Sequence, residues 1–212
     1  MKNKTSIITW LFAPFKYIAG VKALAAGIPV MALISYIAYH SNVYFDGALD
    51  IHVGAAQQTA PYLLHAFYQL CAWFSLSLVF YITGRIVTKT SVRLIDIIGT
   101  LALSQAPLIF AALWGFIPFS HVDFGNPDIQ SLTVNDLIGI FTENFLPLMI
   151  SALVMVVFNV WSIILKYNAY SVSANVKGVK GGVSFAVALI AAEILSKILI
   201  AVISPVFMSI TS

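Results

Sequence analysis

The chain has 212 residues, of which 60% are hydrophobic and only 9% are charged. Soluble domains carry about a quarter of charged residues, so this chain has too few polar side chains to cover a soluble globule. The net charge of +3 is modest and lacks a basic stretch interleaved with aromatic residues, which argues against nucleic-acid binding. The composition therefore predicts a membrane protein.

The first 20 residues combine lysines with an apolar stretch. Ile7 to Phe15 is shorter than the ~20 residues that cross a ~30 Å hydrocarbon layer as a helix. Pro14, Lys16 and Lys22 interrupt the pattern that a signal peptide would need. Since aromatic side chains alternate with lysines, we expect residues 1–20 to lie at the cytosolic interface of the membrane.

Five long apolar stretches follow, and each is about as long as a membrane-crossing helix. Inside a bilayer the backbone must be helical, because no water is present to bond open peptide groups. Pro29, Pro107 and Pro147 are expected to kink these helices without ending them. The predicted fold is all-α: one polytopic membrane domain over 1–212, a bundle of five transmembrane helices at about 21–39, 62–84, 97–117, 145–166 and 183–208.

Charge is sorted between the segments that join these stretches. Ten of the eleven Lys and Arg residues fall in alternate gaps, whereas most acids fall in the other gaps. Because short cytoplasmic loops retain Lys and Arg, the N-terminus and the loops 85–96 and 167–182 are predicted to be cytosolic. The loops 40–61 and 118–144 and the C-terminus are predicted to lie outside. In the second outer loop, Thr133 and Asp136 predict a capping box that begins an amphipathic helix.

Several ionisable and amide side chains lie at membrane depth, where they are costly and often functional. Glu193 and Lys197 are four residues apart, so we expect them to form an ion pair on one helical face. Glu193 is expected between two polar layers. The outer layer contains His65 and Gln69, and the inner layer contains Gln105 and Asn159. Two interpretations stay open: a proton or cation relay or headgroup slot, and a purely structural ion pair with amide contacts between helices.

The predicted outer loops hold weak candidates for a metal site: His40, Asp46, Asp50, His52, His121 and Asp123. Their spacing matches neither a zinc-protease helix nor an EF-hand loop, so solvated acidic loops are favoured and no metal is predicted. No catalytic motif occurs either, so the sequence predicts neither an enzyme nor a cofactor.

Basic residues of the inner loops are candidates for contacts with anionic lipid headgroups. Arg85, Lys89 and Arg93 follow one another at intervals of four residues and would share one face if their loop were helical. The candidates are Arg85, Lys89, Arg93, Lys177 and Lys180.

Two segments carry a family resemblance. The stretch SVRLIDIIGTLALSQAP at 91–107 opens the third apolar stretch after a basic loop, and WSIILK at 161–166 precedes a short Gly/Lys loop and the last stretch. With the five-span layout, these segments resemble the Yip-domain family of Ypt/Rab-interacting membrane proteins, in particular its short bacterial members. The long cytosolic N-terminal region and the Asp-Leu-Tyr-Gly-Pro signature of the eukaryotic members are missing.

The resemblance implies a non-enzymatic protein of the bacterial cytoplasmic membrane, with a role in membrane organisation, trafficking or partner binding. The expected partners are membrane lipids, other membrane proteins or further copies of the chain. Small residues four apart, Ala23 with Gly27 and Ala188 with Ala192, are expected to allow close helix contact. The alternative function is a small proton- or solute-coupled transporter or channel that uses the intramembrane polar layer.

Overall fold

The computed structural model describes residues 6–54, 60–88, 90–121 and 133–211, with side chains up to residue 205. Its long helical segments are α2 (Gly20–Ser41), α3 (Tyr62–Val87), α4 with α5 (Leu94–Leu103 and Leu108–Trp114), α7 (Phe145–Ser173) and α8 (Gly178–Thr211). These five segments are long and apolar enough to cross a membrane, which confirms the predicted all-α bundle. Shorter elements join them: α1 (Ile7–Phe12), the 3₁₀ turns η1 (Pro14–Lys16) and η2 (Pro118–Ser120), α6 (Val134–Glu143), β1 (Val43–Tyr44) and β2 (His52–Val53).

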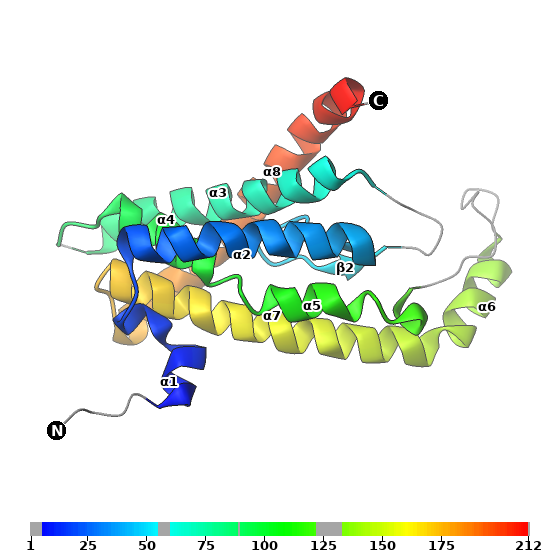
Figure 1. Cartoon of the computed structure of the whole chain (residues 1–212), viewed down its shortest axis with the longest axis horizontal. Helices are drawn as coiled ribbons and strands as arrows, with labels where there is room; N and C mark the ends of the chain where they lie inside the picture. Colours follow the sequence, from blue (N-terminus) through cyan, green and yellow to red (C-terminus); the bar gives the residue numbers. More distant parts are fainter. Residues whose placement is uncertain (1–5, 55–59, 89, 122–132, 212) are drawn as a thin grey trace.

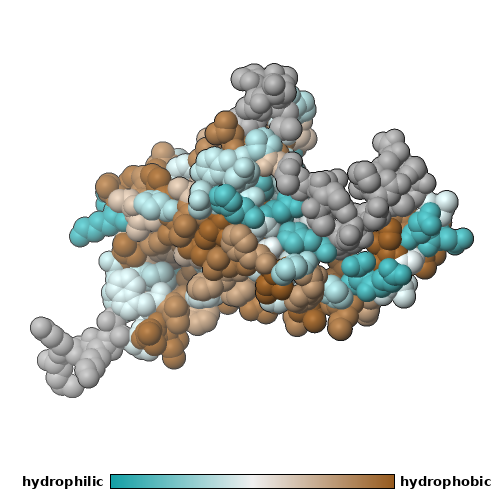
Figure 2. Space-filling model, turned by 45° about the vertical axis from the view of Figure 1, so that its right-hand side comes forward, coloured by the Kyte–Doolittle hydropathy of each residue, from teal (hydrophilic) through white to brown (hydrophobic). Residues whose placement is uncertain are grey.

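The long helices lie roughly side by side, with α3 and α7 on opposite sides of α2 and the α4–α5 pair (Figure 1). The closest pairings are α2 with α4 and α3 with α8, whereas α7 and α8 have little direct contact. The C-terminal part of α8 rises away from the other helices (Figure 1). Apolar residues cover much of the face shown in Figure 2, as expected where lipid surrounds the helices.

Small residues set the distance between α2 and α4. A Cβ atom added to Gly27 would lie only 2.6 Å from the Cβ of Ala102, so this position admits no side chain without a shift of α4. The contact confirms the prediction that Ala23 and Gly27 permit close helix packing. Ala188 and Ala192 of α8 are buried as well, in the core that includes residues of α3.

Proline acts differently in two of the spans. Pro29 lies inside α2, which continues through it as expected. Pro107 instead divides the third span, because it lacks an N–H and its ring clashes with a carbonyl one turn earlier. The backbone turns at Ser104, whose Oγ donates a hydrogen bond to the Leu101 carbonyl at 2.7 Å.

The last two spans are longer than predicted, and the inner loop between them is shorter. α7 continues to Ser173 and α8 begins at Gly178, so most of the expected loop 167–182 is helical. Polar side chains do not end α7 because they find partners within the fold. For example, Ser171 Oγ donates to the Val176 carbonyl at 2.8 Å. As a consequence, Lys166 is 1% exposed inside the bundle and does not mark the cytosolic end of a span.

The predicted capping box at the start of α6 is confirmed. The Thr133 hydroxyl accepts from the backbone N–H of Asp136, and the Asp136 carboxylate accepts from the backbone N–H of Thr133. Leu137, Ile138 and Phe141 of this helix are exposed, which leaves an apolar face available to the membrane interface.

Candidate functional site

The connection between α2 and α3 enters the bundle as a hairpin, defined here as residues 42–54. Its two short strands are antiparallel, with Val43 opposite Val53. The hairpin tip is defined as residues 47–49. Gly47 and Ala48 of the tip and Val43 and Phe45 before it are buried, with Phe45 5% and Ala48 4% exposed, whereas Leu49 is half-buried. The expectation of a solvated acidic loop is therefore wrong for the tip, whereas Asp50 and His52 keep side chains that are about half exposed. The apolar residues of the hairpin provide the driving force for insertion, because burial of such side chains is favourable.

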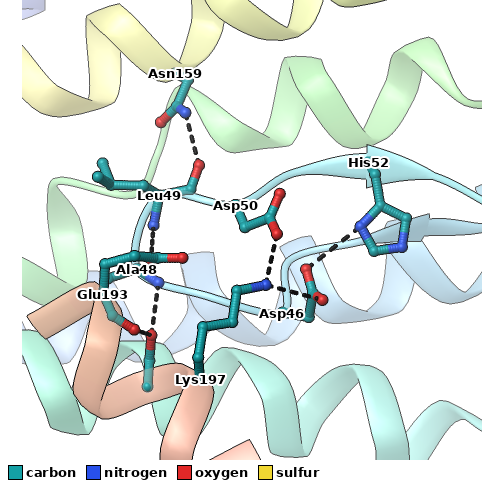
Figure 3. A network of polar contacts seen from close by, with 9 residues as sticks. Asp46, Ala48, Leu49, Asp50, His52, Asn159, Glu193 and Lys197 are labelled. Atoms are coloured by element: carbon teal, nitrogen blue, oxygen red, sulfur yellow. Dashed lines mark hydrogen bonds and ion pairs between the residues drawn. The ribbon is translucent and has the colours of Figure 1, made fainter. Parts of the chain in front are cut away.

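Side chains of helix α8 bind the tip from one side, where they accept hydrogen bonds from backbone N–H groups of the tip. The N–H of Leu49 donates to Glu193 Oε2 at 2.7 Å, and the N–H of Ala48 donates to Ser196 Oγ at 3.1 Å (Figure 3). Gly47 makes this approach possible, because an added Cβ would lie 2.5 Å from Glu193 Oε1.

Side chains of helix α7 bind the same tip from the other side, where they donate hydrogen bonds to backbone carbonyls of the tip. The ammonium group of Lys166 donates to the Ala48 carbonyl at 2.8 Å. The amide of Asn159 donates to the Leu49 carbonyl at 2.7 Å (Figure 3). The backbones of α7 and α8 approach each other at few positions, and their direct side-chain contacts, around Tyr170 and Phe185, lie near the loop that joins them. The tip is therefore the structural link between the two helices at this depth.

The tip also separates two opposite charges inside the bundle. Lys166 interacts electrostatically with Glu193 while each binds a backbone group of the tip. Lys166 is buried whereas Glu193 is half-buried, and no direct ion pair joins them among the described residues, so it is the tip that connects the two side chains.

Lys197 makes its ion pairs with the hairpin. Its Nζ atom lies 3.1 Å from Asp46 Oδ2 and 2.5 Å from Asp50 Oδ2 (Figure 3). His52 Nδ1 lies 3.3 Å from Asp46 Oδ1. Among the ion pairs of the described residues, none joins Lys197 to Glu193, so the predicted pair is wrong. The inserted hairpin supplies each of the two side chains with a closer partner.

The four residues Asp46, Asp50, His52 and Lys197 are called the ion cluster below. Burial opposes ionisation of Asp46, but hydrogen bonds and charges from His52 and Lys197 lower the pKa of this carboxyl below its ordinary value. The hydrogen bond to Asp46 raises the pKa of His52, against the effect of burial. With His52 neutral, two carboxylates and one ammonium leave the cluster with one negative charge. With His52 protonated, the cluster is neutral.

The structure brings three of the weak metal candidates together. Ligand atoms of Asp46, Asp50 and His52 lie within 4.8 Å of one another, a donor set that suits several divalent metals. The ammonium group of Lys197 lies against both carboxylates, so a cationic side chain already occupies this position.

The other candidates lie elsewhere. The ring of His40 contacts the rings of Tyr36 and Tyr39, whereas the ring nitrogens of His121 lie within hydrogen-bond distance of the Gly54 and Gly115 carbonyls. Asp123 lies outside the described residues.

A cavity of about 430 Å³ separates the hairpin from α7. Asp50 and His52 form part of its wall, and both side chains are about half exposed. Ser151 and Asn159 of α7 line the opposite wall, and Met155 lies between them in the sequence. The cavity therefore connects the ion cluster with Asn159, one of the residues that hold the tip.

The polar side chains that were predicted to form two layers instead make separate contacts in different parts of the bundle. Gln69 donates to Gln105 directly, although the two were expected in different layers. His65 packs its ring 4.7 Å from the ring of Tyr44 in the hairpin. Asn159 and Glu193 meet only through the tip.

The basic residues proposed for lipid headgroups do not share a helical face. α3 ends at Val87 and Arg93 precedes α4, so the intervening segment is not one helix. Arg93 lies 3.7 Å from Asp96, and Arg85 lies over the ring of Tyr81. Lys89 lies outside the described residues. Lys177 and Lys180 are exposed at the start of α8.

Sequence reasoning missed the role of Lys166 and of Ser196, and it missed the inserted tip. The hairpin sequence did contain a signal, because apolar residues alternate with acids there. A solvated loop would not be expected to contain so many apolar residues as Phe45, Ala48, Leu49 and Ile51. No protein-family model, curated protein or solved structure matches the chain.

Proposed function

We propose that the chain is a small membrane transporter that exchanges protons for small monovalent cations at the ion cluster. One observation carries the proposal: the cavity between the hairpin and α7 has Asp50 and His52 on its wall, next to Asp46 and Lys197. The carboxylates attract a cation to this wall.

The charge of the ion cluster supplies a basis for coupling. A cation in the cavity neutralises the cluster when His52 has lost its proton, and protonation of His52 neutralises it when the cavity holds no cation. Because charge is expensive in a low-dielectric setting, the two neutral states are favoured over the others. Binding of the cation and binding of the proton therefore compete.

The hairpin tip supplies a barrier that has to move for transport. It lies between the cavity and the charged pair of Lys166 and Glu193, and it links two helices that have little other contact. Irregular backbone is tolerated at membrane depth where it is buried in protein or lines a cavity, and transporters use such segments near their binding sites. Release of the tip would free α7 and α8 from each other at this depth, whereas the contacts of Tyr170 with Ser184 and Phe185 would still join them near their connecting loop.

The test is flux into proteoliposomes loaded with a pH-sensitive dye, with Na⁺, K⁺ and methylammonium as the probes. We expect cation entry to alkalinise the lumen, because a proton leaves for each cation that enters, and Asp50→Asn and His52→Gln to reduce this signal at least tenfold. Asp136→Asn in the remote helix α6 is the matched control and should keep full flux. Flux equal to that of empty liposomes, or full flux in Asp50→Asn, would refute the proposal.

A second candidate is a protein that organises the membrane or binds partners, as the Yip-domain resemblance implies. The four hydrogen bonds that fix the tip favour it, because they fit a static role. Such a protein would give no flux in the same experiment and would be fully folded.

A further inference from the structure

We propose that an anionic phospholipid binds at the end of the bundle where α2 begins, with one acyl chain in a groove beside the N-terminal segment. The groove has a volume of about 510 Å³ and an almost entirely apolar lining. Its wall is formed by Trp10, Ile18, Ala26, Ala106, Phe110 and Trp161, which belong to segments far apart in the sequence.

The groove is built by the fold and is more than a gap between two helices. The side chain of Trp161 donates to the Leu11 carbonyl at 2.9 Å, and Asn168 donates to the Phe12 carbonyl at 2.9 Å. These bonds from α7 fix the N-terminal segment, whose Phe15 is 2% exposed in the core. The opposite wall is the turn between α4 and α5, where Pro107 interrupts the helix.

The geometry suits a lipid that enters from the interface. Ile18 of the groove wall precedes α2, and Ala26 of the same wall lies about 9 Å along α2, counted from Gly20 at 1.5 Å per residue. Tryptophan side chains prefer the headgroup level, whereas the apolar wall of Phe110 suits a hydrocarbon chain. The groove therefore runs from the interface towards the hydrocarbon layer.

Charge decides between an anionic and a zwitterionic lipid. Residues 1–45 include four lysines and no Asp or Glu. Lys16 lies between the groove residues Pro14 and Ile18 and is exposed, and Lys22 is exposed one turn before Ala26. Asp96, which lies against Gly20, is paired with Arg93. Lysines at a membrane surface attract anionic headgroups by about 1 kcal/mol each.

The experiment uses the full chain in vesicles of phosphatidylcholine with a trace of phosphatidylglycerol that carries a photoreactive diazirine on one acyl chain. A phosphatidylcholine probe with the same chain is the comparison, and labelled peptides are mapped by mass spectrometry. We expect the anionic probe to label residues 10–18 and 103–110 several-fold more than the neutral probe. Ala106→Phe, which fills the groove, should reduce this labelling several-fold.

The double variant Lys16→Gln with Lys22→Gln should lower labelling by the anionic probe to the level of the neutral one. Lys177→Gln with Lys180→Gln, which removes two exposed lysines elsewhere, should leave it unchanged. Equal labelling by the two probes would show bulk lipid only and would overturn the proposal. Labelling that Ala106→Phe leaves unchanged, or crosslinks between two copies of the chain in place of lipid, would overturn it too.

Discussion

Lys166 and Glu193, opposite charges that bind the same hairpin tip, should be coupled in a double-mutant cycle. Lys166→Met leaves Glu193 without its counter-charge, and Glu193→Gln leaves Lys166 without its own, while Gln keeps an acceptor for the Leu49 N–H. Breaking a buried pair by removing one partner costs about 3–5 kcal/mol. This is the upper limit for each single variant, because Glu193 is half-buried and forms no direct ion pair with Lys166.

The double variant should be more stable than either single one. It contains no unpaired charge, and its main loss is the hydrogen bond from Lys166 to the Ala48 carbonyl. An unpartnered buried backbone group costs about 1–3 kcal/mol, which is the expected total for the double variant. The coupling between the two positions is then several kcal/mol, well above the value for independent sites.

The assay is unfolding of the purified protein in mild detergent by titration with a denaturing detergent, followed by tryptophan fluorescence. A second cycle, Glu193→Gln with Lys197→Met, is the control, because Lys197 is paired with Asp46 and Asp50. Its coupling should be much smaller than that of the first cycle. If Lys197 couples to Glu193 more strongly than Lys166 does, the assignment of charge partners is wrong.

Two further perturbations test the hairpin itself. Gly47→Ala should destabilise the protein by about 1–3 kcal/mol, because its Cβ would displace the Glu193 carboxylate from the tip. Gly182→Ala, where nothing lies within 4 Å, should be neutral or stabilising in the same titration, and equal losses in both would contradict this account. The raised pKa of His52 implies that its contact with Asp46 stabilises the fold fully below the unfolded pKa of about 6.5 and is lost as pH rises through the higher folded pKa. The melting temperature should therefore fall across that range by more in the wild type than in His52→Gln, and identical pH profiles would remove His52 from the ion cluster.

The spans were predictable because hydrocarbon imposes a length and a composition on each helix separately. The capping box of α6 was predictable for a similar reason, since Thr133 and Asp136 are close in the sequence. Helix ends near polar residues were harder. The sequence predicts Lys166 at the cytosolic end of a span, whereas its ammonium group donates to the buried Ala48 carbonyl of the hairpin tip. A hydropathy profile scores each residue by itself, so it cannot predict that a distant backbone carbonyl will accept a hydrogen bond from a buried lysine.

The inserted hairpin could not be predicted, because its partners are far away along the chain. Leu49 binds Glu193 across a separation of 144 residues, and Lys166 binds Ala48 across 118. A single sequence has no local pattern that pairs such positions. Glu193 and Lys197 illustrate the opposite error, since their helical spacing suggested a pair that the structure replaces with contacts to the hairpin.

The most direct test of the central claim is thiol accessibility of the hairpin tip in sealed membranes. Ala48→Cys and Asp50→Cys are made separately with Cys71→Ser, and a membrane-impermeant maleimide is added from the side of the hairpin. Because Ala48 is 4% exposed and the Asp50 side chain 46%, residue 50 should react readily and residue 48 only after denaturation. Equal labelling rates at the two positions would show that the tip does not lie between α7 and α8.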